Sequence, residues 1–113
     1  MEPCYNLNYL TQISNGDVDF EKDIINTFLK NVPQDMQRLA EAIKDKNGEK
    51  THYYSHKMKP SFQLLQLSCT ENLKYIEIEG KSIDKSWESI EKNYRIIQEI
   101  VNAVIDDLGK INS

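Results

Sequence analysis

The sequence predicts an all-α fold, specifically an antiparallel up-and-down four-helix bundle with a short additional N-terminal helix. Apolar residues recur three or four positions apart over most of the chain, and they nowhere alternate with polar residues as in a half-buried strand. Turn and capping residues divide the chain into segments of helical length, and short connections make consecutive helices antiparallel. A chain of 113 residues is expected to form one domain, 1–113.

The first two helices are separated by Asn15-Gly16, a turn signal after which Asp17 can cap the longer second helix. The apolar residues of the first helix are Leu7, Leu10 and Ile13. Those of the second are Phe20, Ile24, Ile25, Phe28, Leu29, Val32, Met36, Leu39 and Ile43. Pro33 lies inside this second pattern, so we expect a kink or a break between residues 30 and 34.

Three further helices follow, and Asn47-Gly48 begins the third. The inner residues of that helix are expected to be Tyr54, Met58, Ser61 and Leu65. The spacing of Ser68 and Glu71 is that of a capping box opening the fourth helix, which Gly80 ends. Its inward residues are expected to be Leu73, Tyr75 and Ile76. The last helix is long and amphipathic, with apolar residues Trp87, Ile90, Tyr94, Ile97, Val101, Val104 and Leu108.

Composition and charge exclude several classes of function. The net charge of −4 gives no basic field for nucleic acid or an anionic membrane surface. No apolar run has the length of a membrane span, and the N-terminus lacks the features of a signal peptide. We therefore expect a cytoplasmic monomer without membrane insertion. Cys4 and Cys69 share no close-spaced motif, which favours buried or idle thiols over a disulfide or a metal pair.

The stretch HYYSHKMKPSF, residues 52–62, contains the candidate site. At about 100° per residue, His56 lies opposite the apolar stripe of its helix and must point outward. The residues sharing its face are His52, Lys59, Pro60 and Gln63. An exposed imidazole is largely neutral at cellular pH, so its free nitrogen is a competent nucleophile. The Lys59 ammonium, one turn on, can stabilise an anion formed on that nitrogen.

Two other interpretations of these residues stay open at this point. Histidine and lysine are common on solvated helix faces and need have no function there. His52 and His56, spaced i and i+4, could also bind one metal ion. However, the segment HYYSH lacks the glutamate of an HExxH zinc site, and a third ligand would have to be a carboxylate. We expect no metal in this chain.

Pro60 favours a functional site. It lacks an N–H group, and the carbonyl that it leaves without a donor is that of His56. Proline inside a helix costs about 3 kcal/mol. Because the apolar stripe continues to Leu65, the helix is expected to run through Pro60. A local rule broken beside a reactive side chain is typical of a functional site.

The segment His56-Lys57-Met58-Lys59-Pro60-Ser61, followed by Leu64-Leu65, resembles the motif of the histidine-containing phosphotransfer (HPt) domain family of bacterial two-component phosphorelays. The similarity extends over nearly the full chain. The resemblance implies that His56 accepts a phosphoryl group from the aspartyl phosphate of a response-regulator receiver domain and passes it to another receiver. Lys59 matches the phosphate-facing lysine of the family, and Ser61 matches its small residue that lets helices pack behind the histidine.

This resemblance also implies which partners the chain has. It further implies that the chain needs neither a cofactor nor kinase activity of its own. The partners would be receiver domains, a hybrid sensor histidine kinase, or both, and a receiver would cover His52, Pro60 and Gln63. No cofactor is expected on this chain, because the divalent metal belongs to the receiver. No nucleotide-binding motif is present, so the chain is expected to be a relay component without kinase activity. Pro60 and Gln66 stand where the family often has glycine, which bears on partner choice.

Two alternatives of another class are a receiver-docking module that carries no phosphate and a structural bundle without a partner. Intact His56 and Lys59 favour the relay. The sequence leaves open whether the chain is a free protein or a domain of a hybrid kinase.

Overall fold

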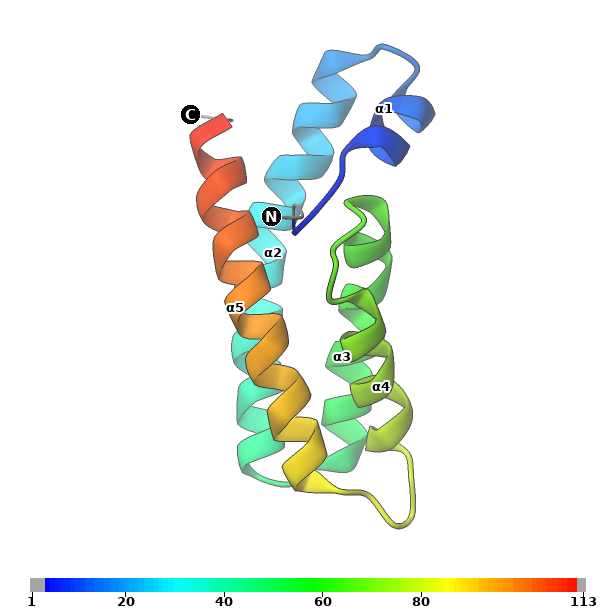
Figure 1. Ribbon diagram of the computed structural model, residues 1–113, viewed down its shortest axis with the longest axis vertical. Helices are drawn as coiled ribbons and strands as arrows, with labels where there is room; N and C mark the ends of the chain where they lie inside the picture. Colours follow the sequence, from blue (N-terminus) through cyan, green and yellow to red (C-terminus); the bar gives the residue numbers. More distant parts are fainter. Residues whose placement is uncertain (1–3, 112–113) are drawn as a thin grey trace.

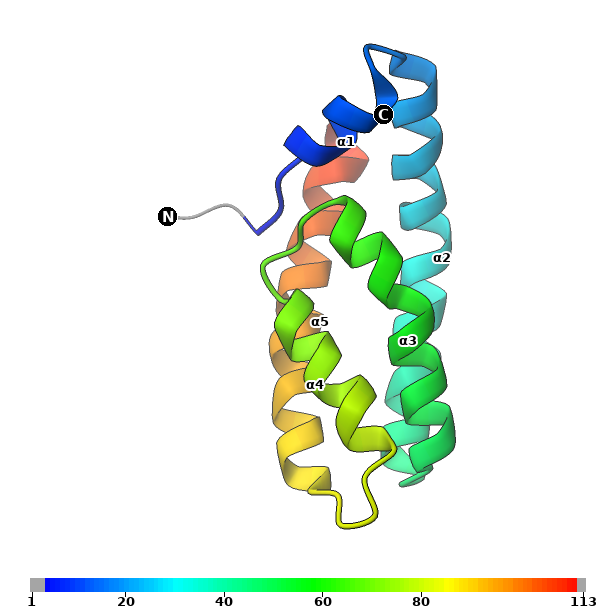
Figure 2. The ribbon, with the colours of Figure 1, turned by 90° about the vertical axis from the view of Figure 1, so that its right-hand side faces the viewer.

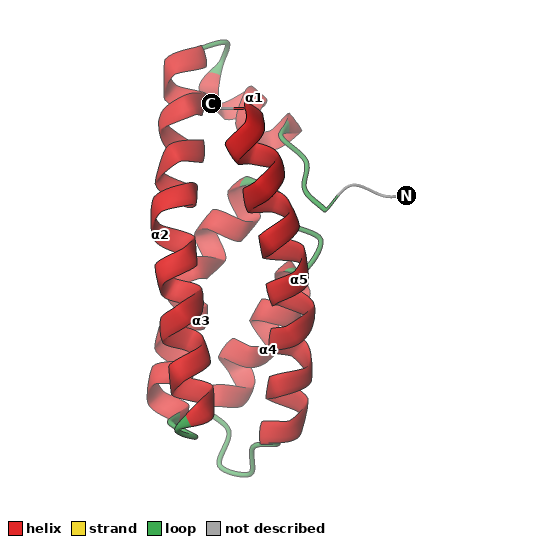
Figure 3. Ribbon diagram, turned by 90° about the vertical axis from the view of Figure 1, so that its left-hand side faces the viewer, coloured by secondary structure: helices red, strands yellow, loops and turns green. Residues whose placement is uncertain are grey.

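The computed structural model describes residues 4–111, and for Ile111 the backbone alone. Within this range the chain is all-α, as predicted, and forms five helices. They are α1 (Asn8–Ser14), α2 (Val18–Lys44), α3 (Gly48–Leu64), α4 (Thr70–Gly80) and α5 (Trp87–Ile111). Figure 3 shows only helices and loops over the described residues. In the same range, no helix combines the length and the apolar composition needed to cross a membrane.

The helices form an elongated body of 46 × 24 × 23 Å, along which α2 and α5 run (Figure 1). Helix α3 packs against α2 on one side and against α4 on the other, and α5 closes the arrangement by contacting both α2 and α4. Helix α1 packs on α2 near one end of the body (Figure 2). A residue on the exposed face of α3 therefore has α2 on one flank and α4 on the other.

Three predicted helix boundaries are confirmed. The Asp17 carboxylate accepts a hydrogen bond from the Phe20 N–H at 3.0 Å and caps α2. The Asn47 side chain accepts one from the Lys50 N–H at 3.0 Å and caps α3. Such caps satisfy N–H groups that have no acceptor within the first turn of a helix. Helix α4 ends at Gly80, as its sequence indicates.

The predicted capping of α4 is wrong, and of the kink or break predicted at Pro33 the break does not occur. Ser68 does not cap α4, because Cys69 directly precedes its first residue and gives no side-chain cap. The Thr70 hydroxyl turns back instead and donates to the Leu67 carbonyl at 2.7 Å. Pro33 does not break α2, which is continuous from Val18 to Lys44. Buried Val32 and Met36 hold the helix in the core on both sides of the proline, which explains why no break occurs.

The predicted stripes of α2 and α5 pack into the core, except that Phe20 of α2 is 42% exposed. The inner face of α3 is wider than expected. Met58 and Leu65 are buried, whereas Tyr54 and Ser61 are only half-buried. The buried residues of α3 that the stripe missed are Thr51, Ser55 and Phe62. Because α3 packs on two helices, small polar side chains on its flanks become buried too. The Ser55 hydroxyl donates to the Thr51 carbonyl at 2.7 Å, whereas the Thr51 hydroxyl has no hydrogen-bond partner.

The two cysteines are free thiols, as expected. Cys69 is fully buried, and this burial raises the pKa of its thiol to about 12. Cys4 is half-buried, and its carbonyl accepts a hydrogen bond from the Ser68 N–H at 2.8 Å. The segment before α1 is thereby attached to the connection between α3 and α4.

Candidate functional site

His56 lies on the exposed face of α3, and 66% of its side chain is accessible to solvent. Its predicted outward orientation is therefore confirmed. The ring is nevertheless not free to rotate. Its Nδ1 atom is hydrogen bonded to the Oε2 atom of Glu77, a residue of α4 that the sequence analysis did not single out.

Glu77 is the centre of the site. Its side chain is only 9% exposed, and its Oε1 atom accepts a hydrogen bond from Lys59 Nζ at 2.8 Å. Burial acts to raise the pKa of this carboxyl group, but the hydrogen bonds and charges of Lys59 and His56 outweigh burial and hold the pKa below its ordinary value. Glu77 is consequently ionised at neutral pH.

The ionised carboxylate fixes the tautomer of His56. A carboxylate without a proton can only accept hydrogen bonds, so Nδ1 of the imidazole must carry the proton. The lone pair of the neutral ring then lies on Nε2, which points away from Glu77. A carboxylate that accepts from one ring nitrogen in this way orients the ring and fixes its tautomer. His56 therefore presents a directed nucleophile to the solvent.

The His52 ring contacts the backbone of the same glutamate. The Nδ1 atom of His52 donates to the Glu77 carbonyl at 2.7 Å. This carbonyl lies in the last turn of α4, where intrahelical donors are missing, and the Lys81 N–H bonds to Ile78 instead. His52 thus caps α4, while its ring stacks on that of His56 with centroids 5.9 Å apart. It is half-buried and has no carboxylate partner of its own.

A second lysine–carboxylate pair lies on the opposite flank of α3. Lys57 Nζ donates to Asp35 Oδ1 of α2 at 3.0 Å, and Asp35 is 10% exposed. The hydrogen bond and the charge of Asp35 raise the pKa of Lys57. In contrast to Glu77, the Asp35 carboxylate accepts no hydrogen bond from a histidine of the described residues.

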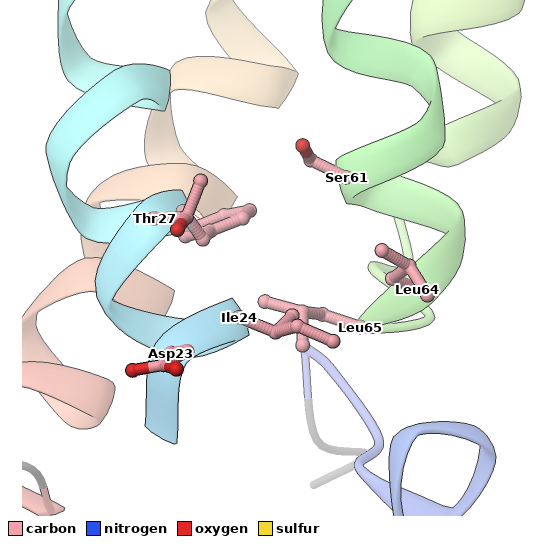
Figure 4. Close-up of a pocket in the computed structure, with 7 residues that line it drawn as sticks. Asp23, Ile24, Thr27, Ser61, Leu64 and Leu65 are labelled. Carbon is pink, nitrogen blue, oxygen red and sulfur yellow. The ribbon is translucent and has the colours of Figure 1, made fainter. Parts of the chain in front are cut away.

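Pro60 and Gln63 are exposed on the face of His56, as predicted. Helix α3 continues to Leu64, so Pro60 lies inside it and gives no N–H to the His56 carbonyl. Ser61 has a different environment. It lines a pocket of about 180 Å³ between α2 and α3, whose other lining residues are Asp23, Ile24, Thr27, Phe28, Leu64 and Leu65 (Figure 4). Ser61 therefore lies toward α2, away from the contact between His56 and Glu77.

The donor set near His56 forms a hydrogen-bond network. His52 donates its Nδ1 proton to the backbone carbonyl of Glu77. His56 donates its Nδ1 proton to Oε2 of the Glu77 carboxylate, and Lys59 donates to Oε1. A metal ion on the two histidines would need a carboxylate as its third ligand. Glu77 is in contact with both histidines, but both of its carboxylate oxygens already accept hydrogen bonds. In the described part of the chain, no group of three or more histidine, cysteine, aspartate or glutamate residues is placed to hold a metal ion.

Glu77 could have been found from the sequence. Leu73, Ile76, Glu77 and Gly80 are spaced i, i+3, i+4 and i+7, which is the pattern of one buried helix face. The prediction placed Tyr75 there instead, but Tyr75 is 37% exposed. A carboxylate at a core position needs a partner, and this requirement points to the histidine and lysine of the neighbouring helix.

Comparisons with protein-family models, with curated proteins and with solved structures found no significant match.

Proposed function

We propose that this chain is a phosphorelay intermediate that accepts a phosphoryl group on Nε2 of His56 and passes it on. The donor is an aspartyl phosphate of a response-regulator receiver domain, and the acceptor is another receiver. The observation that carries the proposal is the exposed imidazole whose Nδ1 is bonded to buried, ionised Glu77. This contact leaves the lone pair on Nε2, on the side of the ring away from Glu77, while Lys59 is bonded to the other oxygen of the same carboxylate.

The fold and the sequence motif support the same proposal. Helices α2 to α5 contact one another in the cyclic order α2, α3, α4 and α5, which suits the antiparallel up-and-down four-helix bundle of HPt domains. The residues from His56 to Ser61 resemble the motif of that family. A receiver docking on this face would meet His52, Pro60 and Gln63 around the reactive nitrogen.

The transfer step makes one bond and breaks one. The Nε2 lone pair attacks phosphorus, the bond from phosphorus to the aspartyl oxygen breaks, and the aspartate leaves as a carboxylate. The imidazole then carries a positive charge, and Glu77 stabilises it through the Nδ1 proton, as a carboxylate stabilises imidazolium in a catalytic triad. Lys59 stabilises the negative charge of the phosphoryl group. Transfer to the next receiver runs through the same steps in reverse.

The remaining requirements fall to the partner. Phosphoryl transfer depends mostly on positioning and on charge stabilisation, and the receiver supplies the phospho-aspartate and its divalent metal. This chain supplies the nucleophile, the carboxylate that orients it and one cation. It needs no cofactor of its own and acts as an intermediate without kinase activity.

The test is incubation of the chain with a phosphorylated receiver domain, followed by detection of label on the chain. We expect an adduct that is labile to acid and stable to base, as a phosphoramidate is. His56→Gln should abolish labelling, whereas His52→Ala should keep it within about tenfold, or roughly 1.4 kcal/mol in barrier terms. Equal loss from both substitutions would contradict the assignment of His56.

The same experiment separates the relay from its alternative, a receiver-docking module of the same fold without phosphotransfer. Such a module would form a complex with the receiver and remain unlabelled. Binding without label, at receiver concentrations that saturate the chain, would favour the module and reject the relay.

A further inference from the structure

Two glycines, Gly48 of α3 and Gly80 of α4, meet where these helices pack together, and neither glycine is explained by its backbone conformation. Gly16 is the described glycine with a positive φ, at 86°, so Gly48 and Gly80 adopt conformations open to any residue. Gly48 is the first residue of α3 and Gly80 is the last residue of α4. Their backbone conformation alone does not require glycine at either position.

The reason is the space that a side chain would occupy. A Cβ atom at Gly80 would lie 2.9 Å from the His52 nitrogen and 3.1 Å from the Gly48 carbonyl oxygen, both of them backbone atoms. A Cβ atom at Gly48 would lie 2.7 Å from the Gly80 carbonyl oxygen. These distances are too short for a methyl group, and backbone cannot rotate away as a side chain can. Alanine at either position must move the two helices apart.

This separation matters because Glu77 lies one turn before Gly80 on the same buried face of α4. All the hydrogen bonds that Glu77 makes across to α3 end within about three turns of Gly48, on His52, His56 and Lys59. The donor–acceptor distance of a hydrogen bond can vary by only a few tenths of an ångström. A small outward shift of α4 would therefore remove the acceptor from His56 Nδ1.

We propose that Gly48 and Gly80 are positioning residues whose backbone contact holds the Glu77 carboxylate on His56 and so fixes the reactive tautomer. The chemical role of this tautomer rests on the function proposed above, but its existence does not. Without the acceptor, the ring proton distributes over both nitrogens. The fraction of molecules with a lone pair on Nε2 then falls, although the fold is retained.

The test compares Gly80→Ala with Gly109→Ala, an identical change in α5 at a site where a Cβ atom meets nothing within 4 Å. The tautomer of His56 is measured from its ring nitrogen chemical shifts on the isolated chain at neutral pH. We expect the Nδ1–H form to dominate in the parent and in Gly109→Ala, and a mixture in Gly80→Ala. Phosphorylation by a receiver should slow about tenfold in Gly80→Ala and remain unchanged in Gly109→Ala.

Gly48→Ala is a second variant that changes the same contact from the opposite helix, and it should reproduce the mixed tautomer. An unchanged tautomer in both folded variants would overturn the proposal. Unfolding of both, while Gly109→Ala folds, would overturn it too, because the glycines would then serve stability alone. The nitrogen shifts need no partner, so a parent chain that is never phosphorylated would reject the relay and still leave this measurement decisive.

Discussion

The two flanks of α3 contain the same chemical pair in different surroundings. On each side a lysine of α3 bonds to a carboxylate that is about nine-tenths buried, Lys59 to Glu77 on the α4 side and Lys57 to Asp35 on the α2 side. The lysines differ, since the Lys59 side chain is 26% exposed and that of Lys57 is 51% exposed. Glu77 also accepts from His56, whereas the pair on α2 has no imidazole.

The two flanks also differ in packing, which is tighter on the α4 side than on the α2 side. The α4 side has no room for a methyl group between Gly48 and Gly80. The α2 side leaves a pocket of about 180 Å³ beside Ser61. Close packing fixes a carboxylate to within the tolerance of a hydrogen bond, and a looser contact does not. The two flanks thus suggest that α4 orients the reactive group, while α2 supports the helix that carries it.

The largest expected effect comes from removing the charge of the Glu77 carboxylate, compared with the same change at Asp35. Glu77→Gln should slow phosphorylation of His56 about a hundredfold, a loss at the upper end for a residue that orients a reactive histidine. An amide cannot hold the Nδ1 proton as an ionised carboxylate does. Asp35→Asn, the matched control, should change the rate less than about threefold, since this corresponds to under roughly 0.7 kcal/mol. Transfer rates from a phosphorylated receiver measure both, and equal losses would remove the distinction between the flanks.

A smaller effect is expected from the two lysines. Lys59→Ala should shorten the lifetime of the phosphohistidine or slow its formation about tenfold, equivalent to roughly 1.4 kcal/mol, because a cation near the phosphoryl group is lost. Lys57→Ala should leave both quantities close to those of the parent chain. The decay of the purified adduct gives the lifetime directly. An equally short lifetime in the two variants would indicate a general effect of charge on α3 rather than a contact specific to Lys59.

The smallest expected effect concerns stability and pH. The pKa of Glu77 is lowered in the folded chain, so its ionised form contributes stability that is fully present above the unfolded pKa, near 4.3. That contribution is lost as the pH falls through the lower, folded pKa. The parent should exceed Glu77→Gln by about 1 kcal/mol in unfolding free energy at pH 7.

Urea unfolding at pH 7, 5 and 3 measures this difference. It should be similar at pH 7 and 5 and should shrink at pH 3. A difference that is constant over this range would show that Glu77 acts by packing rather than by charge. Asp35→Asn serves as the control for replacing a buried carboxylate that has a single, exposed lysine partner.

The sequence predicts the helices well because its signals are local. Asp17, Asn47 and Gly80 act on residues within one turn, and the long stripe of α5 records a single buried face. Pro33 shows where local rules fail, since tertiary packing on both sides of the proline keeps α2 continuous. The inner face of α3 was missed in part because two neighbouring helices bury residues that do not lie on one stripe.

Of the candidate site, the sequence predicts the half that lies on α3. His56 and Lys59 share one helix, so their spacing is enough to place them together. Glu77 is 21 positions away from His56, and only the packing of α4 on α3 brings the two side chains into contact. The roles of Gly48 and Gly80 are likewise invisible in a single sequence, because a glycine at a helix end is usually a stop signal.

The buried thiol of Cys69 makes the α3–α4 connection measurable by chemical labelling. Only the thiolate reacts with alkylating reagents, and this side chain is 0% exposed with a pKa of about 12. Alkylation of Cys69 therefore requires the connection to open, and its rate at a given reagent concentration reports how often opening occurs. The alkylation rate of Cys69 in the native chain is thus a measure of how often the connection opens between the two helices that bring Glu77 to His56.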